Sequence, residues 1–62
     1  MIDISIPTYN RALRLELALL SAASLPSDHF AIRVFDNGST DDTLRIVKKF
    51  TPRVKYLRWN SN

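Results

Sequence analysis

The sequence predicts an α/β fold built around a three-stranded parallel sheet, in the element order β-α-β-α-β. Runs rich in β-branched and aromatic residues alternate with stretches of helical periodicity; strands are expected at residues 2–6, 30–35 and 54–59, and helices at residues 11–24 and 43–50. Consecutive parallel strands are joined by right-handed crossovers through the helices. We therefore expect helices over the faces of the sheet and a loop at the carboxyl end of each strand.

Composition limits the class of protein. The 62 residues are 45% hydrophobic and carry a net charge of +3, which is typical of a small globular domain and not of a disordered chain. The lack of cysteine and the single histidine exclude a disulfide framework and a thiolate or imidazole metal cluster. No apolar run approaches the roughly 18 residues of a membrane span and no basic leader begins the chain, so a cytoplasmic location is expected, with the inner face of the membrane as a further option.

The first strand and the first helix have clear boundaries. Isoleucines alternate with polar residues over residues 2–6, and Pro7, which has no N–H to donate, ends the strand. Leucines and alanines then recur at helical spacing from Arg11 onward, and Asn10 is a suitable N-cap. The helix is expected to end before Pro26, because a residue that precedes proline is biased away from the α region.

The second half of the chain repeats this order. Residues 30–35 form an apolar run between turn residues, as expected for a strand that is covered on both faces. The helix at residues 43–50 is amphipathic, with Ser39 or Thr40 as its expected N-cap, and the acidic pair at residues 41–42 in its first turn suits the helix dipole. The β-branched and aromatic content of the last segment favours a third strand over a third helix.

Two loops fall at the ligand-binding edge of such a sheet, outside the carboxyl ends of the strands: PTYN after the first strand and DNGSTDD after the second. We expect them to be neighbours in space, although a strand-to-helix turn requires such residues even without a ligand. The single glycine, Gly38, excludes a dinucleotide fingerprint and a P-loop, so side chains and helix amides would have to bind a ligand. A nucleobase meets this requirement, because its imide N–H needs an acceptor and its face needs an apolar or aromatic surface such as Tyr9.

The segments SIPTYNRALRLELAL and AIRVFDNGSTDDTLRIVKKFTPRVKYLR resemble the amino-terminal half of the family 2 inverting glycosyltransferases, which have the GT-A (Rossmann-like) fold. The resemblance extends from Ile2 to Asn60, so residues 1–62 are expected to be a partial GT-A domain. It implies a nucleotide-sugar donor that lies against the two loops. The donor-binding residues that it implies are Pro7, Thr8, Tyr9, Asp36, Asn37 and Gly38.

Asn37 departs from the commonest pattern of this family, in which a carboxylate at this position accepts the N3–H of uracil. The amide oxygen of Asn37 can still accept a hydrogen bond, but more weakly than a charged group. Asp-Asn-Gly-Ser sequences resemble the rhamnosyl-type branches of the family. The implied donor is therefore hexosyl or rhamnosyl, and its nucleotide is left open among UDP, dTDP and GDP.

The catalytic residues of the family are expected outside this segment. The resemblance implies an Asp-x-Asp motif for a divalent metal, Mg²⁺ or Mn²⁺, and a catalytic base, both beyond Asn62. The Asp41-Asp42 pair is interpreted as a partner of the helix dipole and not as a metal site. No catalytic or metal-binding residue is assigned, the 62-residue chain alone is expected to be inactive, and the acceptor, a glycan or a lipid, is left open.

A basic tract leaves a second class of function open. After Asp42 the chain carries basic residues interleaved with aromatic ones and no acid; the basic residues are Arg45, Lys48, Lys49, Arg53, Lys55 and Arg58. Such a tract can bind phosphates, which leaves a small nucleic-acid-binding module as the alternative. The same cations can also occupy a solvated helix face, and no nucleic-acid partner is expected. The uncovered apolar faces and sheet edge of a partial domain also predict self-association.

Overall fold

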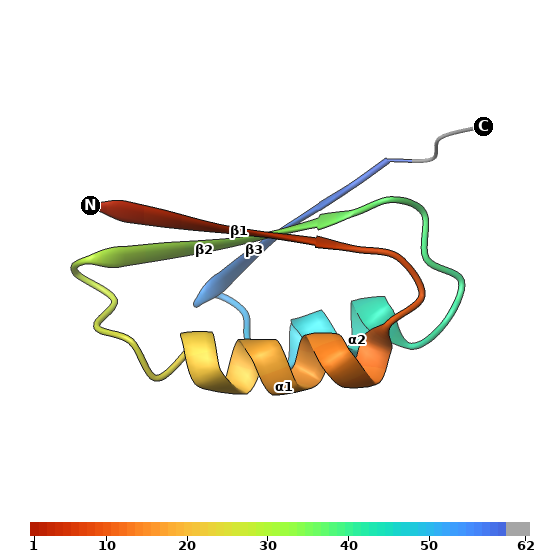
Figure 1. Ribbon diagram of the computed structural model, residues 1–62, viewed down its shortest axis with the longest axis horizontal. Coiled ribbons are helices and arrows are strands. Elements are labelled where there is room, and N and C mark those ends of the chain that lie inside the picture. The colour runs from red at the N-terminus through yellow and green to blue at the C-terminus, as the bar shows by residue number, and fades with distance from the viewer. Residues whose placement is uncertain (60–62) are drawn as a thin grey trace.

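The computed structural model describes residues 1–59 and has the expected order of elements (Figure 1). The strands are β1 (Ile2–Thr8), β2 (Phe30–Asp36) and β3 (Val54–Arg58), and the helices are α1 (Ala12–Ala22) and α2 (Thr43–Lys48). The prediction that Pro7 ends the first strand is wrong, since β1 continues through Pro7 to Thr8 in register with β2. Both helices end slightly before the predicted bounds, where the chain continues as turns. Residues 60–62, which the predicted domain includes, lie outside the described residues.

The three strands form one parallel sheet in the order β1-β2-β3, with β2 in the centre. Both helices lie on the same face of this sheet, below it in Figure 1, and pack against each other. Two right-handed crossovers that step in the same direction place both helices on one side. The expectation that both faces are covered is therefore wrong for residues 1–59, and β2 alternates between buried Ile32 and Val34 and exposed Arg33.

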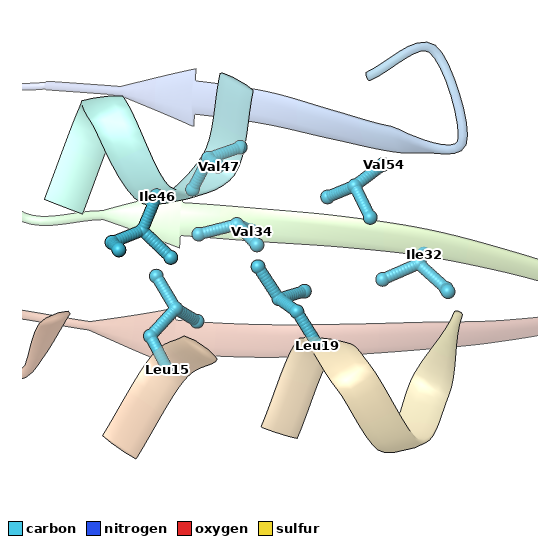
Figure 2. Packing of buried hydrophobic residues seen from close by; sticks show 7 residues of the cluster. All are labelled: Leu15, Leu19, Ile32, Val34, Ile46, Val47 and Val54. Carbon is cyan, nitrogen blue, oxygen red and sulfur yellow. The ribbon is translucent and has the colours of Figure 1, made fainter. Parts of the chain in front are cut away.

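The hydrophobic core lies between this face of the sheet and the two helices (Figure 2). Two leucines of α1, four residues apart and thus on one side of the helix, meet β-branched residues of α2, β2 and β3. The core residues are Leu15, Leu19, Ile32, Val34, Ile46, Val47 and Val54. Because each helix begins directly after one of the two predicted loops, this packing also holds both loops at the same edge of the sheet.

The helix N-termini are capped differently from the prediction. Asn10 has a left-handed backbone with φ 49°, and its Oδ1 accepts a hydrogen bond from the N–H of Thr40 at 2.8 Å, so it does not cap α1. Instead, Oδ2 of Asp41 accepts from the N–H of Ala12, the first residue of α1, at 3.2 Å. Its Oδ1 accepts from the N–H of Thr43, the first residue of α2, at 3.1 Å. One carboxylate thus caps both helices.

The predicted N-caps of α2, Ser39 and Thr40, do not cap it. The N-cap position belongs to Asp42, whose side chain makes no capping bond, and the acidic pair precedes the first turn. The side chain of Asp41 caps α2 instead of Ser39 or Thr40. The hydrogen bond from the Thr43 hydroxyl, supported by backbone N–H groups, lowers the pKa of Asp41 and outweighs the opposing effect of burial.

Asp41→Ala should destabilise the chain by about 1–2 kcal/mol, because it removes a capping bond from two helices at once. In a domain of this size, each 1 kcal/mol lowers Tm by roughly 4–8 °C, which thermal unfolding followed by circular dichroism can measure. Asp42→Ala is the matched control, since it loses only an exposed ion pair with Arg45. An equal decrease in Tm for the two variants would contradict the capping role of Asp41.

Candidate functional site

A pocket of about 380 Å³ opens at the carboxyl edge of the sheet, where the three strands end. It is lined by Pro7, Thr8, Tyr9, Arg11, Phe35, Asn37 and Trp59. The lining contains four of the predicted donor-binding residues, namely Pro7, Thr8, Tyr9 and Asn37, and does not contain Asp36 or Gly38. The structure therefore brings both predicted loops to one concave site.

Hydrogen bonds between the two loops hold the pocket together. The N–H of Asn10 donates to Oγ of Ser39 at 2.8 Å, and the N–H of Thr40 donates to Oδ1 of Asn10 at 2.8 Å. The N–H of Asn37 donates to the carbonyl of Thr8 at 3.0 Å, which extends the β1–β2 ladder beyond the ends of the strands. The expectation that the two loops are neighbours in space is confirmed.

The floor of the pocket belongs to the face of the sheet that the helices leave open. Pro7 lies beside Phe35 in the β1–β2 register, and Phe35 lies beside Leu57 in the β2–β3 register. Because successive residues of a strand point to opposite faces, these three residues lie on the face opposite to the core. The N–H of Trp59 donates to the carbonyl of Asp36 at 3.1 Å, so the chain after β3 stays beside β2.

Asp36 lies on the helix-covered face, and its side chain is 0% exposed. Its Oδ1 accepts from the N–H of Ser39 at 2.9 Å and from the Ser39 hydroxyl at 2.6 Å. Its Oδ2 accepts from the hydroxyl of Tyr56 and lies 3.5 Å from a guanidinium nitrogen of Arg58, which also donates to the carbonyl of Ser39 at 2.8 Å. The buried carboxylate thus joins β3 to the loop after β2.

These surroundings keep Asp36 ionised. Burial raises the pKa of its carboxyl, but the bonds from Ser39 and Tyr56 and the charge of Arg58 outweigh burial, so the pKa lies below its ordinary value. Burial and the bond to Asp36 raise the pKa of the Tyr56 hydroxyl, which remains a donor at neutral pH. A direct contact between Asp36 and a base stays a prediction, and it would require these bonds to rearrange.

Gly38 supplies the turn that follows β2. Its φ of 83° lies in the left-handed region, which costs glycine little because it has no Cβ. The turn brings the N–H of Ser39 back toward Oδ1 of Asp36 and leaves Asn37 exposed at the pocket. Gly38 therefore shapes the site without lining it.

Sequence reasoning missed three lining residues, which are Arg11, Phe35 and Trp59. Phe35 is the last apolar residue of the second strand and Trp59 follows the third strand, so both lie at the edge where ligands of parallel sheets bind. Their place at the carboxyl ends of predicted strands could have identified them as pocket residues from the sequence. Arg11 directly follows the PTYN loop, and within residues 1–59 no acidic side chain forms an ion pair with it.

The acidic residues of the described chain do not fit a divalent metal such as Mg²⁺ or Mn²⁺. Within residues 1–59, no three histidine, aspartate or glutamate side chains are grouped so that they could hold a metal ion. Asp36 and Asp41 accept protein hydrogen bonds, and Asp42 pairs with Arg45 at 2.9 Å. We therefore derive no step through a metal for these residues.

Most side chains of the basic tract form ion pairs or hydrogen bonds within the chain. Arg45 and Lys49 form ion pairs with Asp42 and Glu16 at 2.9 and 3.1 Å. Arg53 donates to two backbone carbonyl groups at 3.0 Å, and the arginine of β3 bonds to the buried carboxylate. The tract is therefore not a continuous stripe of free cations. Within residues 1–59, no helix has the length and apolar character that crossing a membrane requires.

A parallel β-α-β-α-β unit with a pocket at its carboxyl edge is typical of the Rossmann-like class of α/β proteins. The chain belongs to glycosyl transferase family 2, because the sequence profile of that family matches residues 3–62. Among curated proteins, none matches the chain.

Solved structures of the S. aureus protein TarS, residues 1–349, are similar to this chain. One has 31% sequence identity and a TM-score of 0.72, and its match covers 98% of this chain and 19% of that one. The complex with UDP-GlcNAc has 31% identity, a TM-score of 0.74 and the same coverage of 98% and 19%. The complex with UDP has 33% identity and a TM-score of 0.71, with coverage of 100% and 20%. The chain thus spans 19% to 20% of the length of these relatives.

Proposed function

We propose that this chain forms the donor-nucleotide-binding part of a glycosyltransferase that transfers a sugar from a nucleoside diphosphate sugar to a glycan or lipid acceptor. The observation that carries the proposal is the pocket that unites Pro7, Thr8, Tyr9 and Asn37 at the carboxyl edge of the sheet. The complexes of TarS with UDP-GlcNAc and UDP support a nucleotide-sugar donor.

The lining offers the chemistry that a nucleobase needs. Pro7 and Phe35 supply an apolar floor, and the ring of Tyr9 supplies an aromatic surface. The exposed amide of Asn37 carries both an acceptor oxygen and a donor NH₂ group, so it can bind the edge of a pyrimidine or a purine. UDP, dTDP and GDP sugars of hexosyl or rhamnosyl type therefore remain candidate donors. Asp36 would contribute to donor binding indirectly, because its bonds to Ser39 hold the loop that carries Asn37.

The proposed role of these residues is to bind and orient the donor. No residue of the chain is proposed as catalytic. The family resemblance assigns the metal motif and the catalytic base to other segments, so Mg²⁺ or Mn²⁺ is proposed only for a full-length family member. The 62-residue chain is expected to bind a nucleotide without turnover.

Asn37→Asp should strengthen the binding of UDP by about fivefold, because a charged acceptor forms a stronger hydrogen bond with the N3–H of uracil than a neutral amide does. Isothermal titration calorimetry of the chain with UDP, dTDP and GDP measures this change. The gain should be similar for dTDP, because thymine carries the same N3–H as uracil.

Ser21→Asp is the matched control, because it adds the same negative charge at an exposed position of α1 away from the pocket. This control should leave every affinity unchanged. Equal or weaker UDP binding by Asn37→Asp would contradict the assignment of Asn37 to the base edge. The lack of binding of all three nucleotides to the unchanged chain would contradict the proposed function itself.

A further inference from the structure

Three aromatic side chains, each in or directly after a different strand, line the pocket. Tyr9 follows β1, Phe35 lies in β2 and Trp59 follows β3, and all three line the pocket. Because β2 lies between the other two strands, Tyr9 and Trp59 follow the strands on either side of the one that carries Phe35. The rings of Phe35 and Trp59 have their centroids 6.1 Å apart and are tilted by 58°. Such a tilted pair is a favourable arrangement of aromatic rings.

Trp59 is held in place but is not covered by the described chain. Its backbone N–H bonds to the carbonyl of Asp36 at 3.1 Å, and its ring forms the tilted pair with the ring of Phe35. Trp59 nevertheless remains 50% exposed, and Tyr9, which also lines the pocket, is 55% exposed. A large aromatic surface that is oriented by its backbone and still open to solvent is suited to stack on a planar ligand.

We infer that the indole of Trp59 stacks on the face of the donor base and is a binding residue of this pocket. This inference rests on the proposed function, since it takes the nucleotide as the ligand. Stacking tolerates every base, because every base has a π-face, whereas hydrogen bonds to the edge discriminate between bases. Trp59 therefore supplies affinity that is independent of the base, whereas Asn37 bonds to the edge of the base.

The chain offers a direct spectroscopic test because Trp59 is its only tryptophan. Stacking of a base on the indole should quench its fluorescence in a saturable way as UDP or GDP is added. It should also protect the ring from quenching by acrylamide. Binding detected by calorimetry without any change in the fluorescence of Trp59 would overturn the inference.

Substitutions separate stacking from a purely structural role. Trp59→Ala should weaken the binding of UDP and of GDP by a similar factor of about tenfold, whereas Trp59→Phe should retain most of the affinity. Leu17→Ala is the control, because it removes an exposed apolar side chain of α1 that does not line the pocket. Circular dichroism at the temperature of the titration checks that each variant is folded.

The outcomes distinguish this inference from the proposed function. If folded Trp59→Ala binds UDP and GDP as tightly as the unchanged chain, Trp59 only packs on Phe35 and the inference is overturned, while the proposed function stands. A loss for one base alone would also overturn base-independent stacking. If the unchanged chain binds neither nucleotide by calorimetry, both the proposed function and the inference are overturned.

Discussion

Asp36→Ala is expected to destabilise the chain by about 2–4 kcal/mol, because it leaves the partners of a buried carboxylate without their acceptor. Ser39, Tyr56 and Arg58 all bond to this carboxylate, and it joins β3 to the loop after β2. A domain of 62 residues has a total stability of only about 3–9 kcal/mol. The loss is therefore a large fraction of the total stability.

Urea denaturation followed by circular dichroism measures this loss. Asp3→Ala is the matched control, since Asp3 is exposed on the edge strand β1. The control should keep the midpoint of the unchanged chain, and Asp36→Ala should lower it strongly. If the two variants have the same midpoint, the buried network does not stabilise the fold.

The pH dependence gives a second measurement of the same network. The pKa of Asp36 is lower in the folded chain than its ordinary value of 3.8, so its ionised form stabilises the fold. This contribution is fully present above pH 3.8 and is lost as the pH falls below that value through the folded pKa. Asp36→Asn should remove this part of the acid dependence, whereas the part that belongs to Asp41 should remain.

The isolated chain is expected to self-associate through the outer side of α1. Leu13, Leu17 and Leu20 are 71%, 61% and 57% exposed, and their spacing places them on one side of the helix, opposite to the core leucines. Sheet edges and the helix-free face add further uncovered surface in the described chain. Contiguous apolar surface of this kind favours association between copies.

Sedimentation velocity over a range of concentrations tests this expectation, and the average mass should rise with concentration. Leu17→Lys should weaken association by at least about tenfold, because burying one leucine contributes about 1.5–3 kcal/mol. Ser21→Lys, in the same helix, adds the same charge without removing apolar surface. A monomer at all concentrations, or equal effects of the two substitutions, would refute association through this surface.

Local sequence patterns were sufficient to predict the secondary structure and the position of the loops. The order of the five elements was predicted correctly, because periodicity, prolines and turn residues act over a few neighbouring positions. The meeting of the PTYN and DNGSTDD loops was also predicted, because parallel strands bring their carboxyl ends to one edge. The resemblance to glycosyl transferase family 2 rested on the two segments that contain these loops, and the family profile confirms it.

The errors concern groups whose partners are distant in the sequence. Asn10 was predicted to cap the helix that follows it, but its side chain bonds to Thr40, thirty positions away. Asp41 was predicted to act on one helix and caps two, because α1 and α2 begin side by side. The coverage of both faces was expected from the apolar content of the central strand, whereas the strand order leaves one face without helices.

The sequence by itself determined the elements, their order and the family, because each of these depends on residues that are close neighbours or form a contiguous motif. Only the tertiary structure decided the environment of each side chain at the pocket. Strand pairing turned Asp36 toward the core and Phe35 toward the pocket, and it carried Trp59 to the same edge as Tyr9. Adjacent residues of a strand face opposite sides, so their roles are assigned only when the strands are aligned and the helices have covered one face.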